Sequence, residues 1–419
     1  MFVSALLLVA LSFVLWTSNQ KKILRIEVYA GSSWDVPNSR ENRVLDNIIR
    51  QFEKSYPNVK VVYESGIPKK DYDNWLAEKI LKGEQADVFM VPENDFSMLA
   101  SSGAFKSLDS LISKEETAAY YPVAYQAGQY QGHSYALPIE SNPVMMCVNK
   151  DLLEKEGISI PNSNWTLEDL YAICQKVTKD TDGDSLIDQY GITDYTWKQA
   201  LVAYNGHLRN QNGVNVDSVE MHQALSFISK LDSLNQRYKV TSNDFDEGKV
   251  AFYPMSLAQY RTYKPYPYHV AKYSRFSWTC IPMPAAKAGI PATQVKTSLF
   301  AMSSKTKQDK LAWEFMKLLC QNQKNQQELF AKSQGTSVLT SVVKSSQTKK
   351  ILQADDFGLD SLTSQRLDHM MKHSVLDISR DLDYHSLERL DYLLGNALKN
   401  NEIDSILPSI QREMEETGK

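Results

Sequence analysis

LRIEVY at residues 24–29, VKVVYE at 59–64 and ADVFMV at 86–91 each have the length and apolar content of a β-strand. Apolar residues at helical spacing predict one helix between the first two strands, from Arg40 to Tyr56, and another before the third, from Tyr72 to Leu81. Strand, helix, strand, helix, strand is the order of a parallel sheet with helical crossovers. The sequence therefore predicts the α/β fold class.

The same alternation continues beyond this first unit. We expect a strand at 144–148, a helix at 166–179, strands at 250–254 and 277–282, a helix at 307–319, and a mainly helical region from Leu362 onward. Thr166 and Asp169 have the spacing of a capping box at the start of their helix. We find no internal repeat.

The length of 419 residues favours two lobes or domains over one. Hydrophobic residues make up 42% of the chain and charged residues 23%, as in an ordinary globular protein, which excludes a disordered or fibrous chain. The formal net charge of −4 gives no electrostatic reason to bind a phosphate backbone. We therefore expect no nucleic-acid partner.

The N-terminal segment is apolar from Met1 to Trp16, apart from two serines. This run is shorter than the roughly 20 residues of a spanning helix and is typical of the apolar region of a signal peptide, although no basic residue precedes it. We expect residues 1–22 to be a signal or anchor segment and the rest of the chain to lie outside the cytoplasm. With no cysteine at the end of the run, no lipid attachment is expected there.

The four cysteines each lie within an apolar pattern and form no C-x-x-C pair, which excludes the usual metal and redox motifs. An exported chain can form disulfides, but these surroundings favour buried free thiols. The residues are Cys147, Cys174, Cys280 and Cys320.

Four stretches in a fixed order carry a resemblance to a known family. They are ADVF at 86–89 followed by LASSG at 99–103, YALP at 135–138 followed by NKD at 149–151, GKVAF at 248–252, and AWEF at 312–315. The chain resembles the family 1 extracellular solute-binding proteins of ABC importers, the maltose-binding-protein-like group. The resemblance covers residues from about 24 to the C-terminus.

The resemblance implies a two-lobed fold of the periplasmic-binding-protein type II kind, with a ligand cleft between the lobes. Lobe 1 would comprise residues 23–141 with 297–338, and lobe 2 residues 142–296 with 339–419. It further implies a monomer without enzymatic activity or a required cofactor. The protein would capture a mono- or oligosaccharide by lobe closure and deliver it to the permease subunits, touching the membrane only there and through its N-terminal segment.

Candidate ligand-binding residues follow from two arguments. Polar loops after strand ends near a lobe junction are where open α/β sheets bind ligands, which selects Trp34, Asp35, Glu93, Asn94 and Asp95, with Glu140 and Asn142 at the first crossing. The resemblance adds four residues of lobe 2, namely Trp197, Ser256, Gln259 and Tyr260. For a sugar, Trp34, Trp197 and Tyr260 would stack on ring faces while the carboxylates and amides bond hydroxyls.

Two patterns resemble metal sites. Asp180, Asp182, Asp184 and Asp188 occupy positions 1, 3, 5 and 9 of a calcium-type loop, but Gly191 stands where a bidentate Glu belongs. Both structural Ca²⁺ and a solvated turn fit this pattern. His369 and His373 have the i, i+4 spacing of a zinc pair, but no third ligand is evident, which favours a solvated helix face.

Two other functions remain open. Glu93, Asp95 and Glu140 could supply the carboxylate pair of an extracellular glycan hydrolase. The same carboxylates could instead hold an amine, as in a binding protein for a polyamine or peptide.

Overall fold

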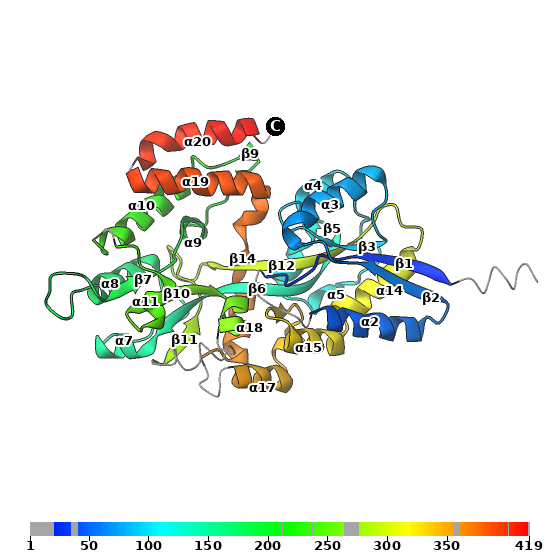
Figure 1. Cartoon of the computed structure of the whole chain (residues 1–419), viewed down its shortest axis with the longest axis horizontal. Coiled ribbons are helices and arrows are strands. Elements are labelled where there is room, and N and C mark those ends of the chain that lie inside the picture. The colour runs from blue at the N-terminus through cyan, green and yellow to red at the C-terminus, as the bar shows by residue number, and fades with distance from the viewer. Residues whose placement is uncertain are drawn as a thin grey trace, which may run out of the picture.

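The computed structural model describes residues 21–34, 41–211, 213–236, 238–263, 276–355, 361–400 and 402–417 (Figure 1). Most of its strands belong to one large mixed sheet: β1 Lys22–Glu27, β2 Val59–Glu64, β3 Val88–Val91, β6 Ala136–Asn149, β7 Tyr190–Ile192, β10 Val250–Ser256, β11 Trp278–Ile281, β12 Thr293–Met302, β13 Thr336–Ser337 and β14 Ser374–Leu376. Two short hairpins stand apart: β4 Gln129–Tyr130 with β5 His133–Ser134, and β8 Arg209–Asn210 with β9 Gly213–Val214.

Helices cover this sheet on both sides. In the first half of the chain they are α2 Glu41–Ser55, α3 Lys69–Lys82, α4 Phe96–Ser101, α5 Lys114–Ala118, α6 Pro122–Ala127, α7 Lys150–Lys155, α8 Leu167–Val177 and α9 Trp197–Ala203. In the second half they are α10 Val219–Ser233, α11 Ser242–Asp246, α12 Leu257–Tyr263, α14 Asp309–Cys320, α15 Gln323–Lys332, α16 Thr340–Val343, α17 Ser346–Asp355, α18 Ser364–Lys372, the 3-10 helix η1 Ile378–Asp381, α19 Tyr384–Asn400 and α20 Ile403–Thr417.

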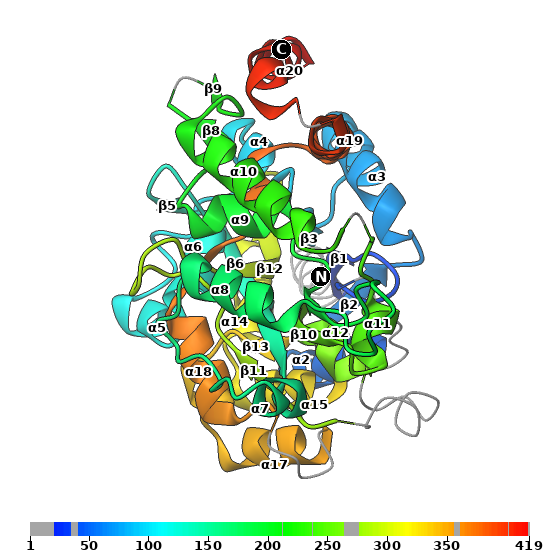
Figure 2. The same ribbon diagram turned by 90° about the vertical axis from the view of Figure 1, so that its left-hand side faces the viewer.

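The buried apolar side chains form three cores, and the first two define the two lobes of the molecule. One core draws on residues between 24 and 139 and between 299 and 329, and we call this part lobe 1. A second core draws on residues between 146 and 292 and between 378 and 414, and we call this part lobe 2. A third core, on the side of α15, α17 and α18, includes residues of β6, β10 and β11. Lobe 1 lies on the right and lobe 2 on the left of Figure 1, and Figure 2 shows α19 and α20 at the end of the molecule opposite α17.

Two long strands join the lobes. β6 pairs with β12 along 136–143 and with β10 and β11 along 144–149. β12 pairs with β14 near its start and with β3 near its end. β13 pairs with β6 at Ser141 and Glu140, which brings a third segment to the same point. The lobe boundaries expected from the sequence fall within β6, within β12 and just after β13.

The predicted α/β class and two-lobed fold are confirmed. The strand at 59–64 has the predicted bounds, and α8 begins with the predicted capping box of Thr166 and Asp169. The main difference is β6, which begins eight residues before the predicted strand, because it continues as one strand through the polar Glu140–Asn142 segment. All four cysteines are buried, as predicted.

Residues 1–20, most of the predicted signal or anchor segment, lie outside the described residues. Across the part of the chain that the structure describes, no helix combines the length and the apolar character needed to span a membrane.

Candidate functional site

The carboxyl ends of two strands from different parts of the chain point toward each other. β3 runs antiparallel to β12 and reaches Leu299, whereas β14 runs parallel to β12 and reaches Val295. Both strands therefore end beside the middle of β12, near Thr297. Polar loops that follow strand ends are common ligand-binding positions in open α/β sheets. The residues after β3 and those after β14 form the candidate site between the lobes.

Glu93, which follows β3, lies near several charged side chains. Burial raises the pKa of its carboxyl to about 7, while the positive charge of Lys296 acts against this rise and the negative charge of Asp377 adds to it. Lys69 and Arg380 also act on this carboxyl. Charged groups from the segment after β3, from β12, from α3 and from the segment after β14 thus lie close together.

Arg380 extends from the segment after β14 to lobe 1. Its Nη2 donates a hydrogen bond to the carbonyl oxygen of Ala127 on α6 at 3.1 Å. Its guanidinium lies 5.5 Å from the ring centroid of Phe96 on α4. Asp377 and Arg380 also line a hollow of about 620 Å³, a volume suited to a small solute, whose other walls include Gln126, Gln129 and His207.

Asp95 belongs to an acidic group that spans the site. Burial raises its pKa to about 6, and the negative charges of Asp73 and Asp383 add to the rise. Asp73 lies on α3, and Asp383 accepts hydrogen bonds from the backbone and hydroxyl of Ser386 at the start of α19. Carboxylates of both lobes therefore face the same space.

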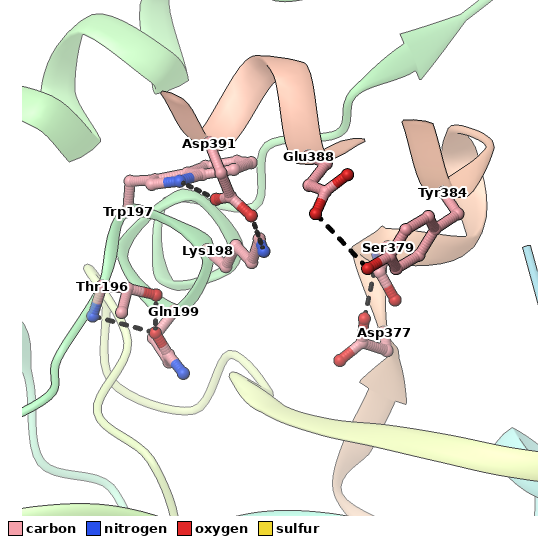
Figure 3. A network of polar contacts seen from close by, with 9 residues as sticks. All are labelled: Thr196, Trp197, Lys198, Gln199, Asp377, Ser379, Tyr384, Glu388 and Asp391. Atoms are coloured by element: carbon pink, nitrogen blue, oxygen red, sulfur yellow. Dashed lines mark hydrogen bonds and ion pairs between the residues drawn. The ribbon is translucent and has the colours of Figure 1, made fainter. Parts of the chain in front are cut away.

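Tyr384 and Glu388 lie on the first turns of α19, directly after Asp383 in the chain, and Figure 3 shows them near Asp377 and Ser379. Tyr384 is 56% exposed, and its hydroxyl donates to Glu388 Oε1 at 3.4 Å. An exposed aromatic ring next to carboxylates can stack on an apolar ligand face while the neighbouring oxygens accept hydrogen bonds.

Sequence reasoning did not identify Lys69, Asp73, Lys296, Asp377, Arg380, Asp383, Tyr384 and Glu388. Five of these residues lie on α3, β12 and α19, where no strand end marks them. For Asp377, Arg380 and Asp383 the available signal was a polar run directly after a strand, the same signal that selected Glu93 and Asp95. It was missed because β14 has only three residues and lies in a region interpreted as mainly helical.

Trp34 and Glu140 lie together on the lobe 1 side. Glu140 is 3% exposed and accepts hydrogen bonds from the Ser333 hydroxyl and, at 2.8 Å, from the Gly335 N–H. Burial raises the pKa of this carboxyl to about 7, although the Ser333 hydroxyl and the nearby Trp34 indole lower it. The indole Nε1 of Trp34 is buried and does not reach hydrogen-bond geometry with the carboxylate. In this conformation the Glu140 carboxylate accepts its hydrogen bonds from groups of the protein itself.

Four of the predicted residues organise the start of α12. The Asn142 side-chain oxygen accepts from Ala258 N at 3.0 Å. Ser256 and Gln259 bond each other's backbone N–H reciprocally, at 2.8 and 3.2 Å. Tyr260 is 1% exposed and packs against Trp278, with ring centroids 5.5 Å apart. Their predicted contacts with ligand stay predictions, and all four have a packing or capping role.

Trp197 begins α9 and is 5% exposed. Its Nε1 donates to Asp391 on α19 at 2.8 Å, and Lys198 pairs with the same carboxylate at 2.6 Å (Figure 3). The ammonium of Lys198 lies 5.4 Å from the Trp197 ring centroid. Both faces of this ring have little room for a ligand here, and its predicted stacking role stays a prediction.

The two remaining candidates give less information. Asn94 follows Glu93 in a partly buried position, within the segment that enters the site. Asp35 lies outside the described residues, so its predicted role stays a prediction.

Three of the four aspartates of the calcium-type pattern come together. Asp180, Asp182 and Asp188 can each offer an oxygen within 4.8 Å of the others, which fits the oxygen ligands that Ca²⁺ prefers. Asp184 instead accepts from Leu186 N at 2.8 Å. Backbone N–H groups of Gly183 and Ser185 bond Asp180, so the loop also has internal support. The predicted calcium site stays a prediction.

We expect millimolar Ca²⁺, added after chelation, to raise the melting temperature of the protein, because an ion bound only by the folded loop stabilises it. Asp182→Asn should remove this rise, since it weakens one of three clustered ligands. Glu154→Gln, at an exposed position of α7, is the matched control and should keep it. A melting temperature that does not respond to Ca²⁺ contradicts calcium binding.

The rings of His369 and His373 are tilted toward each other with centroids 4.3 Å apart, and His373 Nδ1 lies 2.9 Å from the carbonyl oxygen of His369. Burial and the neighbouring His373 lower the pKa of His369. Within the described ranges, no group of three potential metal ligands includes either histidine.

Comparisons with known proteins agree on one family. A sequence profile of bacterial extracellular solute-binding proteins matches residues 47–355. A maltotriose-binding protein of Pyrococcus abyssi is 25% identical over 138 residues, and the match spans 33% of this chain and only 30% of that relative.

Two solved structures align over nearly the whole chain. A sugar-binding protein of Xanthomonas citri aligns with a TM-score of 0.75 and 15% identity, over 94% of this chain and 97% of its own. An ABC substrate-binding protein of Listeria monocytogenes, in complex with cycloalternan, aligns with a TM-score of 0.65 and 18% identity, over 95% and 99%. At these identities the likeness shows a shared fold.

Proposed function

Because the chain belongs to the family of bacterial extracellular solute-binding proteins, we propose that it is the solute-binding component of an ABC importer and that its solute is a carbohydrate. The family works outside the cytoplasm and consists of binding proteins. We further propose that this chain is not an enzyme, acts as a monomer, and delivers its solute to the permease subunits.

The observation that carries the proposal is the convergence of β3 and β14 on β12. It brings Glu93 and Asp95 of lobe 1 toward Asp377, Arg380 and Asp383. A site built from two lobes can close around a solute and release it when the lobes separate. The contacts of Arg380 with α6 and α4 are among those that such a hinge movement would change.

The side chains suit a sugar. A ring hydroxyl both donates and accepts hydrogen bonds, so carboxylates, ammonium groups and a guanidinium can each serve as partners. The exposed ring of Tyr384 offers a flat surface for an apolar sugar face, with Glu388 beside it. Candidate binding residues are therefore Lys69, Asp73, Glu93, Asp95, Lys296, Asp377, Arg380, Asp383, Tyr384 and Glu388.

Two other functions have observations in their favour. The acidic group of Asp73, Asp95 and Asp383 would suit an amine, such as a polyamine. The raised pKa values of Glu93 and Asp95 are those of carboxyls that can hold a proton near neutral pH, as the general acid of a glycan hydrolase does. The test of function must therefore separate binding from turnover and sugars from amines.

The test is a thermal-shift screen of the protein against sugars, oligosaccharides, amino acids, peptides and polyamines. A solute at 100 times its dissociation constant should stabilise the fold by about 2.7 kcal/mol. We expect a sugar to give the shift and to be recovered chemically unchanged. Shifts with only polyamines or peptides would overturn the carbohydrate proposal, and consumption of a glycan would overturn the non-enzymatic one.

A pair of tyrosines on α19 supplies the matched variants. Tyr384→Ala should weaken sugar binding about tenfold or more, because it removes the exposed ring beside the carboxylates. Tyr392→Ala removes a similarly exposed tyrosine further along α19 and should leave the affinity unchanged. Equal affinities of the two variants would contradict the assignment of Tyr384 to the site.

A further inference from the structure

Two cysteines lie directly opposite each other on neighbouring strands. Cys147 of β6 is the register partner of Cys280 of β11 in an antiparallel pair. Their Sγ atoms are 3.7 Å apart, and both side chains are fully buried. The sequence favoured free thiols at both positions because each lies within an apolar pattern. The two residues are 133 positions apart in the chain.

The backbone around the two residues identifies the type of pair. Opposite residues of an antiparallel ladder alternate between hydrogen-bonded pairs, with Cα atoms about 5.5 Å apart, and non-hydrogen-bonded pairs, about 4.5 Å apart. The N–H of Cys280 donates to the carbonyl oxygen of Ser361 at 2.9 Å rather than to β6. The two cysteines therefore form a non-hydrogen-bonded pair, the closer kind.

This geometry suits a disulfide. Disulfide-bonded residues have Cα atoms about 4.4–6.8 Å apart, and a non-hydrogen-bonded pair falls within that range. The two sulfurs already face each other, so a bond needs only small side-chain rotations. Cys174 and Cys320 offer a contrast, because they lie in the separate cores of lobe 2 and lobe 1.

The packing around the two cysteines and the location of the family outside the cytoplasm also favour a disulfide. Cys147 and Cys280 are packed in the third core with Met145, Phe245 and Trp278, an apolar setting that accommodates a disulfide without exposing polar atoms. The family functions outside the cytoplasm, where disulfides form and persist.

We propose that Cys147 and Cys280 form a cross-strand disulfide in the exported protein. The oxidant is an external disulfide, small or carried by a protein, which reacts by thiol–disulfide exchange. The thiolate of one cysteine displaces one sulfur of the oxidant and forms a mixed disulfide; the thiolate of the other then displaces the second sulfur. Two S–H bonds are lost and one S–S bond forms, while the oxidant takes up two electrons and both protons as two thiols.

The burial of both sulfurs determines when during folding the disulfide can form. Because neither side chain is exposed in the folded protein, exchange takes place before β11 closes onto β6. The bond would then enclose residues 147–280, a large part of lobe 2, and restrict the unfolded chain more than a short loop would.

The first test counts thiols. The full chain is unfolded under reducing conditions, refolded with oxidised and reduced glutathione, and alkylated with iodoacetamide in denaturant without further reduction. We expect two alkylated cysteines and a linked peptide pair containing Cys147 and Cys280. Four alkylated cysteines, or a bond that involves Cys174 or Cys320, would overturn the proposal.

The second test measures stability. The oxidised protein should melt about 5 °C above the same protein after reduction, as expected for a loop of this length in a chain of this size. Cys174→Ser should show the same difference, whereas Cys147→Ser should show none. An oxidised form that melts no higher than the reduced form would contradict a bond that fits the native strands. The thiol count uses the unaltered chain and so does not depend on the folding of any variant.

Discussion

Replacement of Arg261 by methionine should destabilise the protein by about 3 kcal/mol, because it breaks a buried ion pair from one side. The Arg261 side chain is only 6% exposed. Its Nε donates to Asp355 at 2.9 Å, and its Nη1 donates to the carbonyl oxygens of Phe330 and Gly335 at 2.9 and 3.0 Å. A methionine would fill much of the space but satisfy none of these oxygens.

The position of Arg261 explains why the loss should be large. It projects from α12 and joins three separate segments: α15, the turn before β13, and α17. The guanidinium also lies 4.7 Å from the ring centroid of Phe330. Gly335 bonds Glu140 through its N–H and Arg261 through its carbonyl, so the arginine holds the segment that supports the buried carboxylate.

Urea denaturation measures the effect, with Arg389→Met as the matched control. Arg389 pairs with Glu413 at 2.6 Å, but both side chains are more than a third exposed, and such pairs contribute about 1 kcal/mol or less. Arg261→Lys, which keeps the charge but not the planar fork, should fall between the two. Similar losses for Arg261→Met and Arg389→Met would show that the buried network adds little.

Local structure was the part of the fold that could be predicted from the sequence. The capping box of Thr166 and Asp169 depends on residues three apart, and the strand at 59–64 on a short apolar run. The full length of β6 was harder to predict, because its segment Glu140–Asn142, which lies between two prolines, is unlike a strand interior. These residues can occupy one because the strand passes between two lobes, where β12 and β13 supply partners for polar residues.

The candidate site likewise combines residues that a local pattern predicts with residues that only long-range strand pairing brings in. Glu93 and Asp95 were predicted because they directly follow an apolar strand, which is a local signal. Their relation to Asp377 and Arg380 depends on the pairing of three-residue β14 with β12, which no local pattern specifies. Ser256 and Gln259 came from the resemblance alone; their spacing is also that of a capping pair, and the structure uses them in that way, while their predicted ligand contacts stay predictions.

The stability of the protein should fall as the pH rises from about 4.5 to 7, in part because of Glu140. Burial raises the pKa of this carboxyl from an ordinary value of 4.5 to about 7 in the folded protein. Below pH 4.5 the group is protonated in both states and adds no pH dependence. Between 4.5 and 7 the unfolded chain releases the proton while the folded chain keeps it, so unfolding becomes easier as pH rises. Above pH 7 the loss of unfolding free energy caused by the buried, charged carboxylate is constant, at about 3 kcal/mol.

Glu140→Gln isolates this effect, because an amide has the shape of the protonated carboxyl and does not titrate. Its oxygen can still accept from the Gly335 N–H. We expect the variant and the original protein to have similar free energies of unfolding at pH 4.5 and the variant to be the more stable at pH 8. Glu78→Gln, at an exposed position of α3, should leave the pH profile nearly unchanged.

The comparison also determines what Glu140 does at neutral pH. If the stability difference grows between pH 4.5 and 7, the carboxylate is charged at a cost in the ligand-free protein, and a solute that bonds it would recover part of that cost on binding. Solute affinity should then depend on pH over the same range, and Glu140→Gln should remove the part due to Glu140 while Glu93 and Asp95 keep theirs. A difference in stability that is constant from pH 4.5 to 8 would show that the Ser333 and Gly335 hydrogen bonds already stabilise the charged form, and would leave Glu140 a purely structural acceptor.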